Sequence, residues 1–280
     1  MRAVLLAAGY GTRLDRDLRN DKSGLYAHLI GVPKPLLPIG KLPLLSHWIN
    51  IFKKCSAIST IVVVVNELHK ELYEKWAASL DTKVCIVSDG SICNDQRSGA
   101  VTCMQLGLQK KKEDTLFIAG DTLLKKDFSL DAVISEFKKL QTKIKCASLI
   151  LCAPVAEENV SKTGIIEVSN AGKVTKFVEK PQPSEVTSRI QSPCFYIIAK
   201  ESLEHLEWFL KEKQDKPLKA RDATGTFISE LIHRAPVYTY QVSHRYDVGN
   251  LQSYIHCHQD FLKEAQKSNC PQKSNCPMKQ

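Results

Sequence analysis

Residues 1–14 read MRAVLLAAGYGTRL, in which an apolar run leads directly into a glycine-rich turn. The run Ala3–Ala7 has the length of a buried β-strand and is too short for the apolar core of a signal peptide. Gly9 and Gly11 let the backbone approach a ligand closely, so that amide groups can face phosphate oxygens. Arg13 then adds a planar set of donors that suits phosphate. The stretch therefore predicts a first strand that ends in an anion-binding loop.

This turn differs from two familiar nucleotide-binding patterns. The GxxxxGK[ST] spacing of a P-loop is absent, and so is the third glycine of the dinucleotide fingerprint. An NAD-dependent oxidoreductase is therefore the least favoured enzyme class. The glycine pair alone is also compatible with a purely structural turn.

Strand-like and helix-like segments alternate after this turn. The predicted strands are 3–7, 61–65, 84–87 and 115–119, and the predicted helices between them are 44–54, 67–80 and 99–108. The β-branched run at 61–65 is apolar on both faces, as expected for a strand covered by helices on both sides. The alternation predicts an α/β fold, a Rossmann-like three-layer sandwich with a mostly parallel mixed central sheet.

The second half of the chain has more strands and fewer helices. The predicted strands are 148–153, 164–168, 173–178, 192–198 and 237–242, and the predicted helices are 202–210, 226–233 and 251–265. Asn170-Ala171-Gly172 predicts a hairpin turn between the strands at 164–168 and 173–178. Residues 1–265 are expected to form one catalytic domain. Residues 266–280 are polar and contain the duplicated segments KSNCPQ and KSNCPM, so we expect a disordered tail.

Composition narrows the choice of partners. The formal charge of +9 favours anionic ligands, but no nucleic-acid motif accompanies it, so scattered surface lysine is the simpler explanation. No apolar stretch approaches the about 18 residues of a membrane span. The ten cysteines form no CxxC pair, and most lie in apolar segments typical of buried reduced thiols. We expect a cytoplasmic protein with no nucleic-acid or membrane partner.

A second segment, PKPLLPIGKLPLL at residues 33–45, gives the glycine turn a context. Its prolines favour an extended, stiff loop that would present Lys34. Together with LAAGYGTRL at residues 6–14, it resembles the paired motifs of the nucleotidyltransferase family that makes nucleotide sugars. That family includes the glucose-1-phosphate thymidylyl- and uridylyltransferases and the mannose-1-phosphate guanylyltransferases. The resemblance covers roughly residues 1–260 and implies the nucleotide-diphospho-sugar transferase type of fold.

The resemblance implies a binding site for a nucleoside triphosphate. The glycine-rich loop would wrap the nucleotide, and Arg13 and Lys34 would contact its phosphates and act in catalysis. Residues 94–100 (NDQRSGA) are similar to the loop that recognises the base. Family members often have Gln where Asn94 stands, so the base is left open. The residues expected to bind the nucleotide are Leu6, Ala8, Gly9, Gly11, Thr12, Asn94 and Gly99.

The resemblance also implies a metal site. Asp121 follows a predicted strand and resembles the family's metal-binding aspartate. Residues 246–250 (YDVGN) resemble its W-x-D-x-G element, with Tyr246 in place of the usual tryptophan, and this element supplies a second carboxylate, Asp247. Two carboxylates with phosphate oxygens suit Mg²⁺, a hard cation. Asp121 and Asp247 are thus the expected metal ligands and catalytic residues. Taken alone, each aspartate is better explained as a turn or helix-cap residue than as a metal ligand.

The expected acceptor site lies in the second half of the chain. Residues 178–181 (VEKP) are similar to the family's EKP element, in which the glutamate holds sugar hydroxyls and the lysine reaches the sugar phosphate. Those roles fall on Glu179 and Lys180, with Gly164 nearby. Arg221 stands where a second phosphate-binding arginine can occur. The site would take a sugar 1-phosphate, most simply a hexose 1-phosphate.

The implied reaction is in-line attack by the acceptor phosphate on the α-phosphorus of the triphosphate, with release of pyrophosphate. Catalysis would consist of positioning and charge neutralisation, without a protein nucleophile. Two alternatives remain: transfer to a non-sugar phosphate such as phosphocholine or inositol phosphate, and a non-catalytic nucleotide-sugar-binding regulatory protein. The presence of Arg13, Lys34, Asp121 and Asp247 favours an enzyme.

Residues 15–32 form an insertion between the two motifs, where family members commonly have a shorter loop. The insertion contains Arg16, Arg19, Lys22 and Tyr26. A lid, a contact in a homo-oligomer and a solvated insertion are all compatible with this composition.

Overall fold

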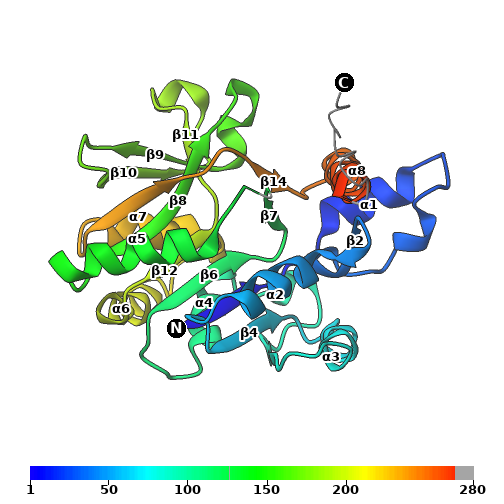
Figure 1. Ribbon diagram of the computed structural model, residues 1–280, viewed down its shortest axis with the longest axis horizontal. Helices are drawn as coiled ribbons and strands as arrows, with labels where there is room; N and C mark the ends of the chain where they lie inside the picture. Colours follow the sequence, from blue (N-terminus) through cyan, green and yellow to red (C-terminus); the bar gives the residue numbers. More distant parts are fainter. Residues whose placement is uncertain (126, 269–280) are drawn as a thin grey trace, which may run out of the picture.

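The computed structural model describes residues 1–125 and 127–268 and has a central sheet with helices on both faces (Figure 1). Ten strands form this sheet within the described residues, in the order β10-β9-β11-β8-β12-β6-β1-β4-β5, with β13 also pairing with β8. The first half of the chain supplies a parallel part: β1 (Arg2–Leu6) lies between β4 (Thr60–Val65) and β6 (Thr115–Ala119), and β5 (Cys85–Ser88) follows β4. The predicted mostly parallel, mixed α/β sheet is confirmed.

The second half of the chain completes the sheet with mixed pairing. β12 (Phe195–Ile198) runs antiparallel to both β6 and β8 (Ser148–Pro154), whereas β13 (Val237–Gln241) runs parallel to β8. β9 (Gly164–Val168) and β10 (Val174–Glu179) form the hairpin predicted from the glycine turn, with Gly172 at a φ of 76°. β11 (Ile190–Ser192) pairs with β8 and β9.

Side-chain alternation along β1 shows why helices cover both faces. Ala3 and Leu5 belong to one hydrophobic cluster, which includes α2 (Leu44–Lys54), α3 (Lys70–Ala78), α5 (Leu130–Lys143) and α8 (Leu251–Ser268). Val4 belongs to the other, with α4 (Ala100–Leu108), α6 (Glu204–Glu212) and α7 (Thr224–Leu231). Successive strand residues point to opposite faces, so an apolar run builds two cores at once. Burying each such Val or Leu contributes about 1.5–3 kcal/mol.

Two short strand pairs lie outside the central sheet. β2 (Pro38–Ile39) pairs with β3 (Leu42–Pro43), and β7 (Thr122–Leu124) pairs with β14 (Arg245–Asp247), in both cases antiparallel. Because β7 directly follows β6, its pairing with β14 places residues 245–247 beside the carboxyl end of β6.

Two helices were not predicted from the sequence. α1 (Thr12–Asn20) begins directly after the glycine turn and buries only Leu14 and Leu18 on a polar helix. It occupies the first part of the predicted insertion and packs beside α8. α5 has Leu130, Val133, Ile134 and Phe137 at helical spacing, and Ser129 caps it by accepting from the amide of Ala132.

The structure also adjusts two predicted boundaries. The strand expected at 192–198 is divided into β11 and β12, because the chain changes strand partners at Pro193-Cys194 and proline has no amide to donate. α8 continues to Ser268, beyond the expected end at residue 265. From residue 269 onward the predicted tail lies outside the described residues. Among those that are described, no helix is long and apolar enough to cross a bilayer.

Candidate functional site

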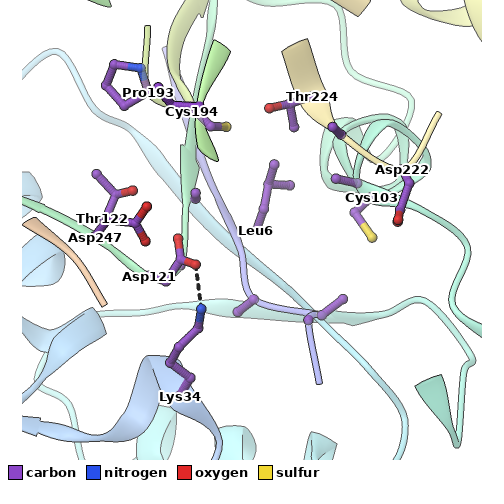
Figure 2. A pocket seen from close by; sticks show the side chains of 18 of the residues that line it. Leu6, Lys34, Cys103, Asp121, Thr122, Pro193, Cys194, Asp222, Thr224 and Asp247 are labelled. Atoms are coloured by element: carbon purple, nitrogen blue, oxygen red, sulfur yellow. Dashed lines mark hydrogen bonds and ion pairs between the residues drawn. The ribbon is translucent and has the colours of Figure 1, made fainter. Parts of the chain in front are cut away.

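A pocket of about 670 Å³ opens at the carboxyl ends of β1 and β6. This is the edge at which α/β sheets commonly bind ligands, because the loops that follow parallel strands gather there. Figure 2 shows part of its wall, with Lys34 and Asp121 on one side and Cys194 and Thr224 on the other. The predicted site residues that line the pocket are Leu6, Ala8, Gly9, Gly11, Arg13, Lys34, Asn94, Gly99, Asp121, Gly164, Glu179, Lys180 and Asp247. Thr12 and Arg221 do not line it.

The glycine-rich turn is held from behind. The buried amide of Asn66 donates to the carbonyl of Ala8 at 3.1 Å, and the hydroxyl of Tyr73 donates to the carbonyl of Ala7 at 3.1 Å. Gly11 adopts a φ of 63°, a left-handed conformation that favours glycine. The chain then enters α1, which has no side-chain cap. A helix N-terminus next to a glycine turn suits an anion.

Lys34 and Asp121 form an ion pair in the pocket. The Lys34 Nζ atom donates to Oδ2 of Asp121 at 2.6 Å. Burial would raise the pKa of Asp121, but Lys34 and, more weakly, Arg245 bring that pKa below its usual value. Glycine at position 120 lets the chain before Asp121 pass close to the end of β1. The Gly120 amide donates to the Leu6 carbonyl oxygen, and a Cβ atom at this position would lie 2.8 Å from the same oxygen.

The pairing of β7 with β14 brings Asp247 close to Asp121. Asp247 lies opposite Thr122, and the Val248 amide donates to the Asp121 carbonyl at 3.0 Å. Figure 2 shows Asp247 beside Thr122 and Asp121. The described residues contain no group of three or more His, Cys, Asp or Glu side chains able to hold a metal. Two carboxylates fit Mg²⁺, which usually keeps waters and takes further oxygens from substrate phosphates.

The opposite end of the pocket surrounds Glu179. This residue ends β10 opposite Gly164, and its carboxylate packs against Gly225, where a Cβ atom would lie 1.9 Å from Glu179 Oε2. Burial raises the pKa of Glu179, and the neighbouring Lys180 only partly offsets that effect. Lys180 has a φ of 49°, an uncommon conformation for a side-chain-bearing residue. Such strain is often found at functional sites.

A third part of the wall follows β5. Asn94 begins a 3₁₀ turn (Asn94–Gln96), and Gly99 precedes α4 with a φ of 90°. Arg97 makes a two-pronged contact with Asp222, with Nε–Oδ1 and Nη2–Oδ2 distances of 3.2 and 3.0 Å. This contact ties the Asn94 loop to the segment before α7.

Arg221 is placed differently from the sequence expectation. Its Nη1 atom donates to the carbonyls of Lys213 and Lys216 at 2.9 and 3.1 Å, so its side chain ties down a loop outside the pocket wall.

Sequence reasoning missed five charged residues that line the pocket, namely Asp89, Arg97, Lys162, Asp222 and Arg245. Arg97 belongs to the predicted base-recognition loop at residues 94–100, but its partner Asp222 is 125 positions away in the chain. Arg245 had one available signal: it lies two positions before Asp247, and residues at that spacing share one face of a strand.

The fold and the pocket together define an α/β protein with a nucleotide-type anion loop, two adjacent aspartates and a second, partly buried subsite. The chain matches the family model described as "Nucleotidyl transferase" over residues 2–264 and belongs to that family. The resemblance found in the sequence is thereby confirmed. Members of this family typically use a divalent metal ion.

Similar proteins include enzymes with different acceptors. UTP–glucose-1-phosphate uridylyltransferase of Synechocystis sp. is 26% identical over 210 residues, which cover 74% of this chain and 51% of the relative. The 2-C-methyl-D-erythritol 4-phosphate cytidylyltransferase of Bifidobacterium longum is 36% identical over 89 residues, 31% of this chain and 26% of the relative. The chain thus spans about half, or less, of the lengths of these relatives.

The fold is shared with a solved structure of UDP-glucose pyrophosphorylase complexed with UDP-glucose. The TM-score is 0.72 at 22% identity, and the match covers 94% of this chain and 98% of that one.

Proposed function

We propose that this chain transfers a nucleoside monophosphate from a nucleoside triphosphate to a sugar 1-phosphate, producing a nucleotide sugar and pyrophosphate. The observation that carries the proposal is that one pocket holds the glycine turn, the Lys34–Asp121 pair, Asp247 and the Glu179 subsite. The Synechocystis relative, named for transfer to glucose 1-phosphate, supports a hexose acceptor.

The residues divide into two binding halves. The glycine turn and Arg13 would hold the triphosphate, with the base beside Asn94 and Gly99. Glu179 would accept hydrogen bonds from acceptor hydroxyls, and Lys180 would face the acceptor phosphate. An oxygen of that phosphate attacks the α-phosphorus, and the bond to the β-phosphate oxygen breaks as pyrophosphate leaves.

Catalysis rests on positioned charge, because the acceptor phosphate is itself the nucleophile. Lys34 would turn from Asp121 to the phosphates of the nucleotide. Asp121 and Asp247 would hold Mg²⁺, which when bound neutralises charge on the α-phosphate. The partly buried pocket strengthens these interactions relative to bulk water.

A second candidate acceptor is a phosphorylated molecule that is not a sugar 1-phosphate. The match to the cytidylyltransferase that acts on 2-C-methyl-D-erythritol 4-phosphate favours testing it. A regulatory protein would bind nucleotide sugar without turnover. The charged groups assembled around Asp121 favour an enzyme over this alternative.

The test is pyrophosphate release with Mg²⁺, measured across five nucleoside triphosphates and a panel of sugar 1-phosphates, 2-C-methyl-D-erythritol 4-phosphate, phosphocholine and inositol phosphate. We expect one productive pair with a sugar 1-phosphate. Asp121→Ala should abolish turnover, whereas Asp81→Ala, at an exposed surface ion pair, should leave it unchanged. Nucleotide binding by folded protein without turnover for any pair would refute the proposal and favour the regulatory protein.

A further inference from the structure

Arg245 is a pocket residue that the expected reaction does not use. It begins β14, two positions before Asp247, and both residues line the pocket. Tyr246 between them points the other way: it is buried, and its hydroxyl donates to Asp260 at 3.1 Å. The two-residue period of a strand therefore places the Arg245 guanidinium on the same face as the Asp247 carboxylate.

The Arg245 guanidinium lies between the two halves of the pocket. On one side its Nη1 atom is 3.3 Å from Oδ2 of Asp247. On the other side its Nε donates to Gln191 Oε1 at 2.8 Å, and its Nη2 donates to Thr163 Oγ1 at 3.4 Å. Gln191 belongs to β11, and Thr163 directly precedes Gly164 of the acceptor subsite. The arginine thus joins the aspartate pair to the acceptor side.

This guanidinium is held in place and still has donors to offer. Only 12% of the Arg245 side chain is exposed, whereas 57% of the Lys180 side chain is. A guanidinium carries five N–H donors in a rigid plane, and three of its nitrogen atoms contact Gln191, Thr163 and Asp247. A side chain already fixed by neutral partners loses little rotamer freedom when a ligand arrives.

The position of this charge fits the acceptor phosphate. A sugar seated at Glu179 and Gly164 must direct its phosphate towards Asp121 and Asp247, where the α-phosphate would be held. Arg245 lies along that path. The acceptor phosphate is an anion that must approach two carboxylates and a triphosphate, so a nearby cation reduces the charge repulsion. The planar fork of donors of an arginine suits a phosphate.

We propose that Arg245 is a catalytic residue that binds the phosphate of the acceptor and aims it at the α-phosphorus. This inference rests on the proposed function. On acceptor binding, the guanidinium exchanges its contact with Asp247 for the phosphate oxygens, while Gln191 and Thr163 keep it oriented. Arg245 transfers no proton and forms no covalent bond.

The experiment compares R245Q and R245K with the wild-type chain, with R234Q as the matched control. Arg234 lies 3.3 Å above the Trp208 ring and does not line the pocket. Four quantities are measured: kcat, the KM of the acceptor and of the triphosphate in the productive pair, and the Kd of the triphosphate without acceptor. Melting temperatures show whether each variant folds.

R245Q should raise the acceptor KM about 10–100-fold, as expected for loss of hydrogen bonds to a charged group. The triphosphate Kd should stay within about threefold, and R245K should recover part of the loss because it restores charge without the fork. An unchanged acceptor KM in R245Q would overturn the inference. So would an equal loss for triphosphate and acceptor, which is the result that a general structural role predicts.

Inorganic phosphate is the second probe, because its binding requires no turnover. Wild-type protein should bind phosphate more tightly than R245Q does. If no pair gives turnover but phosphate binding still depends on Arg245, the proposed reaction fails and the anion site stands. If turnover occurs and phosphate binding is the same in both proteins, the assignment of Arg245 fails and the reaction stands.

Discussion

The Nζ atom of Lys34 lies 2.6 Å from Oδ2 of Asp121, although 87 residues separate the two in the chain. Lys34 begins a 3₁₀ turn (Lys34–Leu36) directly after Pro33, where the sequence predicted an extended loop, and Asp121 follows Gly120 at the end of β6. Each charge is the counterion of the other in the absence of substrate. When a nucleotide and its metal bind, Lys34 can pair with phosphate and Asp121 with the metal. The two side chains can therefore separate without leaving either charge buried and unpaired.

Lys34→Ala should lower kcat/KM for the triphosphate about 10²–10³-fold, the loss typical of removing one preorganised charge-stabilising group. Steady-state kinetics with the productive pair measure this effect. Lys53→Ala is the control, since Lys53 forms an ion pair with Asp81 on the surface. A Lys34→Ala variant with near-normal kinetics would show that Lys34 only neutralises Asp121.

Glu179→Gln should raise the acceptor KM about tenfold or more while it stabilises the fold at neutral pH. Burial raises the pKa of Glu179 above its ordinary value of 4.5. The native chain therefore keeps this proton over a pH range in which the unfolded chain has lost it, so Glu179 weakens the fold as pH rises through that range.

The gain in unfolding free energy for Glu179→Gln should accordingly be present at pH 7 and disappear below pH 4.5. Urea unfolding at both pH values measures it. Glu167→Gln, at an exposed pair with Lys176, should show no such pH-dependent gain. If Glu179→Gln were less stable than wild type at pH 7, the ionised Glu179 carboxylate would not be destabilised by its burial, and this interpretation would be wrong.

Gly225→Ala should impair the acceptor subsite, because the new Cβ would meet Glu179 Oε2 at 1.9 Å and the Phe177 ring at 2.6 Å. We expect a loss of about 1–3 kcal/mol in stability from overpacking, together with a raised acceptor KM. Thermal unfolding and kinetics test the two effects. Gly172→Ala is a useful contrast: it has no atom within 4 Å of its added Cβ, so it should strain only the backbone and spare the acceptor KM.

Arg97→Gln and Asp222→Asn should each destabilise the protein, and the double variant should lose less than the sum. The two-pronged contact is about two-thirds buried, so a coupling of about 1 kcal/mol is expected. A double-mutant cycle in urea measures the coupling. Additive losses would mean that the contact contributes nothing beyond its separate side chains.

Much of the fold follows from local patterns. β1, β4 and β6 are short apolar runs, and α2 has its apolar residues at helical spacing, so periodicity placed these elements correctly. α1 was not predicted because most of its nine residues are charged and only two of them, both leucines, are buried. The division of 192–198 into two strands depends on a change of sheet partner, which leaves only one local mark, Pro193.

The candidate site also has a part that the sequence predicts and a part that only the fold determines. Glycine turns and carboxylates carry their chemistry in their residue types, so Gly11, Lys34, Asp121 and Glu179 could be named from motifs. The partners of these groups could not be named, because hydrogen bonds join segments that are distant in the chain. Arg221 was assigned to a ligand, yet its side chain holds a loop. No sequence motif indicates a role for Arg245, yet it lies between Asp247 and Thr163. A sequence states which charges a chain carries, whereas the folded backbone determines which opposite charge or carbonyl each one meets.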